Sequence, residues 1–242
     1  MRVYAMTDIG RVRALNEDSC YIPAEGERFC AVADGMGGHN AGEVASAMAV
    51  DVFSQNMREA TDISAETLHA AVARANDAVL LKSQQVEGMN GMGTTFSALA
   101  IEGETAFIAH VGDSRVYLIR RGAIMQVTTD HTLVEAMVQQ GVITAREARV
   151  HPKRNIITRA LGTEPRLEID IVQISLRPDD VFFLCSDGLS GYVEDWDILR
   201  VAQDGEKDWQ EKLRTLVGLA LEAGGYDNIT AMFAVYEEES SR

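Results

Sequence analysis

The sequence holds 242 residues, of which 46% are hydrophobic, and it carries a formal net charge of -15. A chain of this length and composition can bury a substantial core. The strong negative charge argues against general affinity for nucleic acid or for an anionic membrane surface, so we expect neither as a partner. No stretch approaches 18 uncharged apolar residues, and the sequence therefore predicts no signal peptide and no membrane span.

The three cysteines, Cys20, Cys30 and Cys185, are odd in number and form no CxxC pair. Two of them lie in apolar runs typical of buried strands. This pattern favours reduced, packed thiols over a zinc site or a disulfide, and it indicates a cytoplasmic protein.

Short apolar runs bounded by Gly, Asp or Asn predict strands, and apolar residues at three- and four-residue spacing predict helices. In chain order the predicted elements are strand 28–34, helices 41–57 and 64–86, strands 94–102, 105–113 and 115–122, helix 132–140, a short helix opened by the Thr144–Glu147 capping box, strands 167–176 and 180–187, helices 196–203 and 208–222, and strand 228–237.

The connections between the strands from 94 to 127 are too short for helical crossovers, so these strands should be antiparallel. Paired helices, a run of antiparallel strands and further helices predict an α+β sandwich and argue against an alternating parallel sheet. With no linker or repeat in the sequence, we expect one domain over residues 1–237, followed by a short acidic tail, 238–242.

Four aspartates lie at the ends of apolar strands beside a glycine or a turn: Asp34, Asp113 and Asp187 end a strand, and Asp227 directly precedes the last one. A single aspartate in a turn usually caps the backbone, and this interpretation stays open for each of them. If the four converge, their repulsion would raise their pKa values unless a cation neutralised them. A ligand set of oxygen atoms without His or Cys favours Mg²⁺ or Mn²⁺ over zinc.

Glycines surround the first of these acids, at positions 35, 37, 38 and 42. Without a β-carbon the backbone can approach a metal closely, and Gly35 could offer its carbonyl oxygen as a ligand. An acidic metal cluster attracts phosphate, which in turn pairs well with an arginine fork. The candidate is Arg13, five residues before Asp18, although a solvated surface charge is the alternative interpretation.

Eight stretches in order along the chain carry a resemblance to a known family. They are TDIGRVRALNED, VADGMGGHNAGEVAS, GMGTTFSAL, AHVGDSRVYLIR, TTDHTLV, ITRALG, LCSDGLSGYV and GGYDNIT, which together span residues 7 to 230. The sequence resembles the bacterial PPM, or PP2C-type, metal-dependent serine/threonine protein phosphatases. The resemblance implies an αββα sandwich of two antiparallel sheets flanked by helices.

The resemblance also implies a binuclear Mn²⁺ or Mg²⁺ centre. Asp34 matches the ligand that bridges two metals, the Gly35 carbonyl matches a ligand of one metal, and Asp187 and Asp227 match ligands of the other. Asp113, together with Asp187, matches the residues that hold a third and weaker metal in bacterial members.

Further roles carry over by the same resemblance. Arg13 matches the phosphate-binding arginine, and Asp18 matches an acid that hydrogen-bonds metal-bound water. The segment 142–158 falls where the family has a mobile flap beside the active site. Better-studied eukaryotic members have a histidine acting as general acid where this chain has Met36, so that role does not carry over. His39 is a candidate substitute, and a histidine that only packs or caps the turn is the alternative.

The resemblance implies hydrolysis of phosphoserine and phosphothreonine in proteins by a metal-bridging water, opposite a bacterial Ser/Thr kinase and on that kinase's substrates. We expect a monomer. Two alternatives remain open: a catalytically inactive phosphoprotein-binding regulatory domain, which should lack one or more ligands, and a metal-dependent phosphodiesterase or nuclease, against which the net charge argues.

Overall fold

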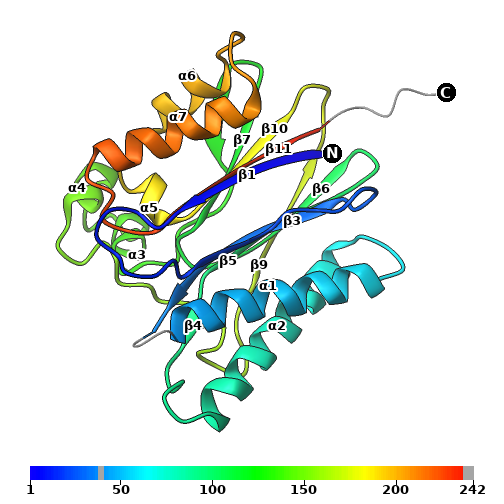
Figure 1. The fold of residues 1–242 in the computed structure, drawn as a ribbon, viewed down its shortest axis with the longest axis vertical. Coiled ribbons are helices and arrows are strands. Elements are labelled where there is room, and N and C mark those ends of the chain that lie inside the picture. Colours follow the sequence, from blue (N-terminus) through cyan, green and yellow to red (C-terminus); the bar gives the residue numbers. More distant parts are fainter. Residues whose placement is uncertain (38–40, 237–242) are drawn as a thin grey trace.

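The computed structural model describes residues 1–37 and 41–236, and two antiparallel sheets face each other at its centre (Figure 1). The first sheet contains, in order, β1 (Arg2–Asp8), β11 (Ile229–Val235), β10 (Val181–Cys185), β7 (Arg115–Arg120) and β8 (Ala123–Gln126). The second contains β2 (Asp18–Tyr21), β3 (Phe29–Met36), β5 (Phe96–Glu102), β6 (Thr105–Val111) and β9 (Asp170–Ser175), with β4 (Gly93–Thr94) paired to β3.

Helices cover the outer face of each sheet. The long pair α1 (Ala41–Glu59) and α2 (Ala65–Gln85) packs on the second sheet, and α6 (Asp195–Ala202) and α7 (Trp209–Glu222) pack on the first. Three shorter helices lie together at one end of the sandwich, on the left in Figure 1: α3 (Leu133–Gln139), α4 (Ala145–Val150) and α5 (Asp187–Ser190). The predicted αββα sandwich is confirmed.

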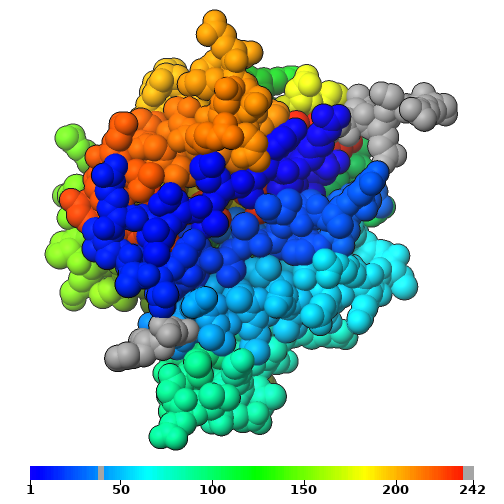
Figure 2. Space-filling view, in the orientation of Figure 1, coloured from blue at the N-terminus to red at the C-terminus, as the bar shows by residue number. Residues whose placement is uncertain are grey.

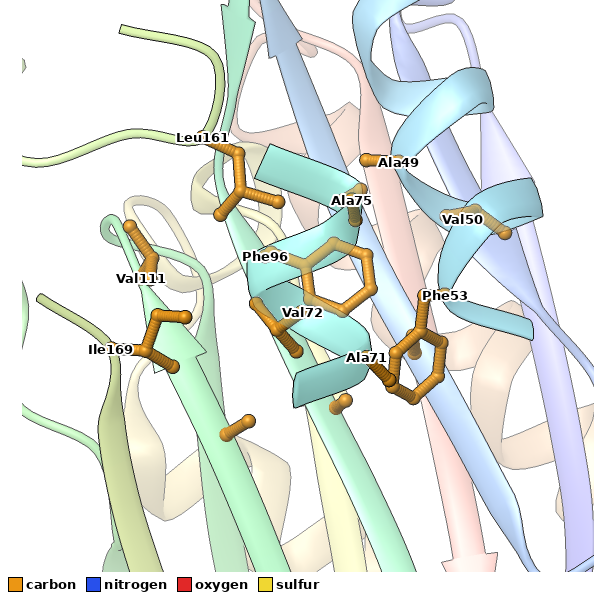
Figure 3. Packing of buried hydrophobic residues seen from close by; sticks show 14 of the residues in the cluster. Ala49, Val50, Phe53, Ala71, Val72, Ala75, Phe96, Val111, Leu161 and Ile169 are labelled. Carbon is orange, nitrogen blue, oxygen red and sulfur yellow. The ribbon is translucent and has the colours of Figure 1, made fainter. Parts of the chain in front are cut away.

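Alternating side chains on the strands divide the core into three apolar layers. In β3, Phe29 and Ala31 face the helices α1 and α2, whereas Cys30 and Val32 face the other sheet. This follows from the two-residue period of a strand, which sends successive side chains to opposite faces. The layer beneath α1 and α2 is centred on Phe53 and Phe96, whose rings meet edge to face (Figure 3).

The N-terminal residues form two strands that the sequence pattern does not predict. β1 pairs along its whole length with β11, so that Arg2 lies opposite Val235 and Asp8 opposite Ile229. β2 pairs with β3 in the other sheet. The first twenty residues thus contribute to both sheets, and in Figure 2 they run across the molecule between the orange α7 and the cyan helices.

Several predicted boundaries are wrong by a few residues. The strand predicted over 94–102 is broken at Thr95 into β4 and β5, and the strand predicted over 28–34 continues to Met36, which puts Asp34 inside β3. β10 ends at Cys185, and Asp187 instead opens α5. β8 has no counterpart among the predicted elements, and the remaining helices and strands agree with their predicted positions to within about three residues.

The three cysteines are free thiols, as predicted, and Cys30 and Cys185 are buried. Within the described ranges, none of the helices is long and apolar enough to cross a membrane. His39 and the predicted acidic tail, 238–242, lie outside the described residues.

Candidate metal centre

Asp34 is held by its backbone at the point where β3 changes partners. Its N–H donates to Thr95 Oγ1 at 2.9 Å, and its carbonyl oxygen accepts from the Thr95 N–H at 2.9 Å and from Thr94 Oγ1 at 2.9 Å. Thr95 can make these bonds because it stands in the break between β4 and β5 and is free of the regular sheet ladder. The position of Asp34 is therefore fixed by the backbone, and its carboxylate is left for other partners.

Asp18 lies directly opposite Asp34 in the β2–β3 pair. The residue is only 8% exposed. Ser186 Oγ donates to Asp18 Oδ2 at 2.7 Å, but Oδ1 is buried and has no hydrogen-bond partner among the described residues. A buried carboxylate oxygen without a partner costs free energy, so this atom faces a place where a ligand would be stabilising.

Asp187 and Asp227 come from neighbouring loops of the other sheet. Asp187 opens α5 directly after β10, and Asp227 precedes β11. The two loops touch at Gly188, where any β-carbon would lie 1.9 Å from the Asn228 carbonyl oxygen. Only glycine allows this approach, which brings the two aspartates to the same end of the sandwich.

The glycines around Asp34 have a comparable structural reason. A β-carbon on Gly35 would lie 2.1 Å from the Gly42 carbonyl oxygen and 2.6 Å from that of Glu17. The Gly35 N–H also donates to the Glu17 carbonyl at 3.0 Å. These glycines therefore let the end of β3, the start of α1 and the loop before Asp18 pack against one another. That the Gly35 carbonyl binds a metal stays a prediction.

The carboxylates perturb one another strongly. Burial, followed by the charges of the neighbouring acids, raises the pKa of Asp34 well above its ordinary value. Burial also raises the pKa of Asp18, to about 7. The pKa values of Asp113 and Asp187 are raised in the same way, first by burial and then by a neighbouring aspartate. Like charges gathered in a poorly solvated place need a compensating cation.

This donor set fits a hard divalent cation. It consists of carboxylate oxygens, the ligands that Mg²⁺ and Mn²⁺ prefer, and it includes the unpartnered Oδ1 of Asp18 nearby. In residues 1–37 and 41–236, no three His, Cys, Asp or Glu side chains are already gathered into a ready-made metal cage.

Arg13 lies at the solvent-exposed edge of the acid cluster, beside Asp227. One of its guanidinium nitrogens donates to Asp227 Oδ2 at 2.8 Å, and another lies 3.8 Å from Glu17 Oε2. The side chain is 47% exposed. The Asp227 bond raises the pKa of the Arg13 guanidinium, which is charged at all relevant pH values. A charged, half-exposed fork beside an acid cluster is suited to an anionic ligand that arrives from solvent.

A pocket of about 580 Å³ opens beside the cluster, and its lining includes Asp113, Asp187 and Asp227. Residues of the predicted flap segment, 142–158, form part of its wall, and they include α4. The opposite wall comes from α5 and the start of α6, with the exposed Trp196 at its rim. Three of the clustered aspartates therefore lie on a solvent-accessible cavity that can admit a substrate.

The groups that hold these acids in place were not predicted from the sequence. Arg115 and Asp130, both in the pocket wall, form an ion pair at 2.6 Å, and Ser186 and Thr95 hold Asp18 and Asp34. The motifs GDSR and TTDH contain the ion pair, but sequence gives no indication that the two motifs meet. Cys185 is no alternative nucleophile, because burial raises the pKa of its thiol to about 12.

Comparisons with known proteins agree with this geometry. The family model of Protein phosphatase 2C matches residues 10–225. The chain is 42% identical over 236 residues to the serine/threonine protein phosphatase PstP of Mycobacterium tuberculosis, which covers 97% of this chain and 45% of PstP. It is 37% identical over 233 residues to the serine/threonine phosphatase stp of Listeria monocytogenes, which covers 93% of this chain and 92% of that protein.

The chain thus spans about half the length of PstP and nearly all of the Listeria protein. Among solved structures, the catalytic domain of PstP in complex with two manganese ions superposes with a TM-score of 0.88 at 38% identity, covering 98% of both chains. The family match covers most of the sequence and includes Arg13 and the aspartates at 18, 34, 113 and 187. The chain belongs to the protein phosphatase 2C family of metal-dependent serine/threonine phosphatases.

Proposed function

We propose that this chain hydrolyses phosphoserine and phosphothreonine monoesters in proteins at the acid cluster described above. The observation that carries the proposal is a set of poorly solvated carboxylates that raise one another's pKa values, three of which, Asp113, Asp187 and Asp227, line one pocket. Carboxylates that destabilise the metal-free protein are expected where they serve a ligand. Family membership identifies the ligand class as a divalent metal and the substrate as a phosphoprotein.

In this proposal Asp34, the Gly35 carbonyl, Asp187 and Asp227 hold two Mn²⁺ or Mg²⁺ ions, and Asp113 with Asp187 holds a third, weaker one. Bound divalent cations lower the pKa of water to near neutrality and stabilise charge on phosphoryl oxygens. The rigid backbone bonds of Asp34 keep its carboxylate in place before substrate arrives, which reduces the reorganisation needed during the reaction.

Arg13 would bind the phosphate through its guanidinium fork. The bond to Asp227 already holds this side chain beside the cluster, so the ordering of a long side chain contributes less to the cost of binding. Two parallel hydrogen bonds from the fork would fix the orientation of the phosphoryl group for in-line displacement of the serine or threonine oxygen.

Asp18 would accept a hydrogen bond or a proton at Oδ1, the oxygen that has no partner in the described chain. A nearby cation lowers the pKa of a carboxyl, so this group would be a carboxylate during turnover even though its pKa is about 7 without one. Met36 has a thioether and cannot donate a proton to the leaving group. His39 remains our candidate for that role.

The substrates would be a bacterial Ser/Thr kinase and the proteins that it phosphorylates, and the enzyme would act as a monomer. Three unpaired cysteines suit a reducing compartment, and we propose the cytoplasm as the site of action. The acidic net charge of -15 gives no support to a nuclease or to a membrane-bound partner.

The test is phosphate release from a phosphothreonine peptide by the purified protein, with Mn²⁺ and with a chelator. Turnover that requires the metal and disappears in the Asp187→Asn variant supports the proposal. A folded protein that binds the peptide but releases no phosphate with either Mn²⁺ or Mg²⁺ contradicts it, and favours the phosphoprotein-binding alternative.

A further inference from the structure

The flap carries a local excess of positive charge in an otherwise acidic protein. The ten residues 145–154, AREARVHPKR, contain four of the 22 Lys and Arg side chains of the sequence and only one acid, Glu147. That acid is occupied by the cap of α4, where its carboxylate accepts from the Thr144 N–H at 2.7 Å. The flap is therefore basic on a chain whose net charge is -15.

Two flap arginines, Arg146 and Arg154, have no side-chain partner among the described residues, although both line the pocket that Asp113, Asp187 and Asp227 also line. Arg149, between them, differs, because it forms an ion pair with Glu194 on the opposite wall. We call Arg146 and Arg154 the flap arginine pair. Both are exposed, so their charges are available to a ligand that enters from solvent.

The acids elsewhere in the pocket wall form no ion pair with these two arginines. Asp130 is bound by Arg115, Asp195 accepts from the Tyr117 hydroxyl at 3.2 Å, and Glu194 is bound by Arg149. The aspartates at 113, 187 and 227 are the ligands assigned above to divalent cations. Glu135 and Asp195 keep their negative charge in the pocket wall, but neither forms an ion pair with Arg146 or Arg154, so both guanidinium groups of the flap arginine pair stay unpaired among the described residues.

We infer that the flap arginine pair binds an anionic group that flanks the phosphorylated residue of the substrate, so that the enzyme prefers phosphopeptides with acidic neighbours. The inference rests on the proposed function, because it assigns the flanking sequence of that same substrate. The anionic group could be a carboxylate or a second phosphate, and both satisfy the same guanidinium chemistry. Charge complementarity at a pocket rim acts on capture of the substrate and is weakened by salt.

The experiment compares phosphothreonine peptides of equal length whose flanks are Glu, Gln or Lys, and a fourth peptide that carries a second phosphoserine. Wild type, Arg146→Gln/Arg154→Gln and a control, Arg177→Gln/Arg214→Gln, are assayed with Mn²⁺. The control removes two exposed arginines that do not line the pocket. Because the ratio of kcat/KM between peptides is taken within each variant, differences in overall activity cancel.

We expect wild type to favour the Glu over the Gln peptide by roughly 3- to 10-fold in kcat/KM, mainly through KM, and to disfavour the Lys peptide. The preference should shrink at high salt, disappear in the flap variant and persist in the control. The second-phosphate peptide shows whether phosphate is preferred to carboxylate. Equal kcat/KM for the Glu and Gln peptides in wild type, or a preference retained by the flap variant, overturns the inference.

The proposed function and the role of the flap arginine pair fail in different ways. p-Nitrophenyl phosphate has no flanking sequence, and it serves as the reference substrate for wild type and control. If neither it nor the Gln peptide is hydrolysed by wild type, the proposed function is refuted. If both are hydrolysed and acidic flanks bring no advantage, only the role of the flap arginine pair is refuted.

Discussion

Replacing Asp18 by asparagine should stabilise the metal-free protein while lowering its activity. Asp18 is 8% exposed, its Oδ2 accepts from Ser186, and its Oδ1 has no partner in the described chain. Asparagine has nearly the same shape and can keep the Ser186 bond through its carbonyl oxygen. The substitution therefore removes the buried negative charge with little change in packing.

The magnitude follows from the pKa of the Asp18 carboxyl. Burial raises it from 3.8 to about 7, a shift of roughly three units, which corresponds to at most about 4 kcal/mol of unfavourable ionisation in the folded state. The amide nitrogen of asparagine would be unpaired in the place of Oδ1, which costs roughly 1–3 kcal/mol. We therefore expect Asp18→Asn to raise the free energy of unfolding by about 1–3 kcal/mol at pH 8 in chelator.

The pH dependence gives a sharper signature. Between about pH 4 and pH 7 the folded wild type holds a proton on Asp18 that the unfolded chain has released, so wild-type stability falls as pH rises through this window. Asp18→Asn lacks this contribution. Near pH 4, where this contribution is absent, the unpaired amide should leave the variant less stable than wild type by roughly 1–3 kcal/mol; the difference should reverse as pH rises towards 7 and level off by pH 8.

The assay is urea unfolding of wild type, Asp18→Asn and the exposed control Asp51→Asn, at pH values from 5 to 8 in chelator and in Mn²⁺. The free energy of unfolding of the control should differ from that of wild type by no more than about 0.5 kcal/mol. Excess Mn²⁺ should reduce the difference in free energy of unfolding between Asp18→Asn and wild type, because a bound cation compensates the charge of the wild-type carboxylates. The reasoning would be refuted if Asp18→Asn were less stable than wild type at pH 8 in chelator. It would also be refuted if the free energy of unfolding of the two proteins changed equally with pH.

Three further substitutions test the site and its support. Asp187→Asn should reduce turnover by at least 100-fold with little loss of folding, and a variant that keeps most of its phosphate release would remove Asp187 from the centre. Arg13→Ala should raise KM for phosphopeptides more than it lowers kcat, and an unchanged KM in steady-state kinetics would count against a phosphate role. Gly188→Ala should destabilise by roughly 1–3 kcal/mol in urea unfolding and reduce metal affinity, because its β-carbon meets the Asn228 carbonyl at 1.9 Å. The matched change Gly218→Ala, in α7 with nothing within 4 Å, should instead stabilise by about 0.5–1 kcal/mol, and equal effects of the two would contradict the packing argument.

The sequence was sufficient to predict the two-sheet architecture because its central strands are apolar and its turns are short. It did not reveal β1, since this strand lies at a sheet edge and most of its residues are only half-buried. A four-residue strand such as β2 carries too little pattern to be recognised. Both pair with strands whose partners could be identified only in three dimensions.

The aspartates at 34, 113, 187 and 227 could be proposed from sequence because each lies at one end of an apolar strand, beside a glycine or a turn. The residues that hold these aspartates and Asp18 in place could not be predicted from sequence. Ser186 and Asp18 are 168 positions apart, and local sequence contains nothing that links them. The break at Thr95 likewise depends on its bonds to Asp34, which compete with the regular ladder of the sheet. The roles of the ligands themselves stay predictions.

The most direct test of the central claim is to measure Mn²⁺ binding by calorimetry and phosphate release in the same preparations of wild type and Asp34→Asn. We predict that wild type binds two Mn²⁺ ions per chain and that turnover rises as they bind, whereas folded Asp34→Asn loses both the binding and the turnover. An Asp34→Asn protein that binds Mn²⁺ with unchanged stoichiometry and still hydrolyses the phosphopeptide would contradict the account.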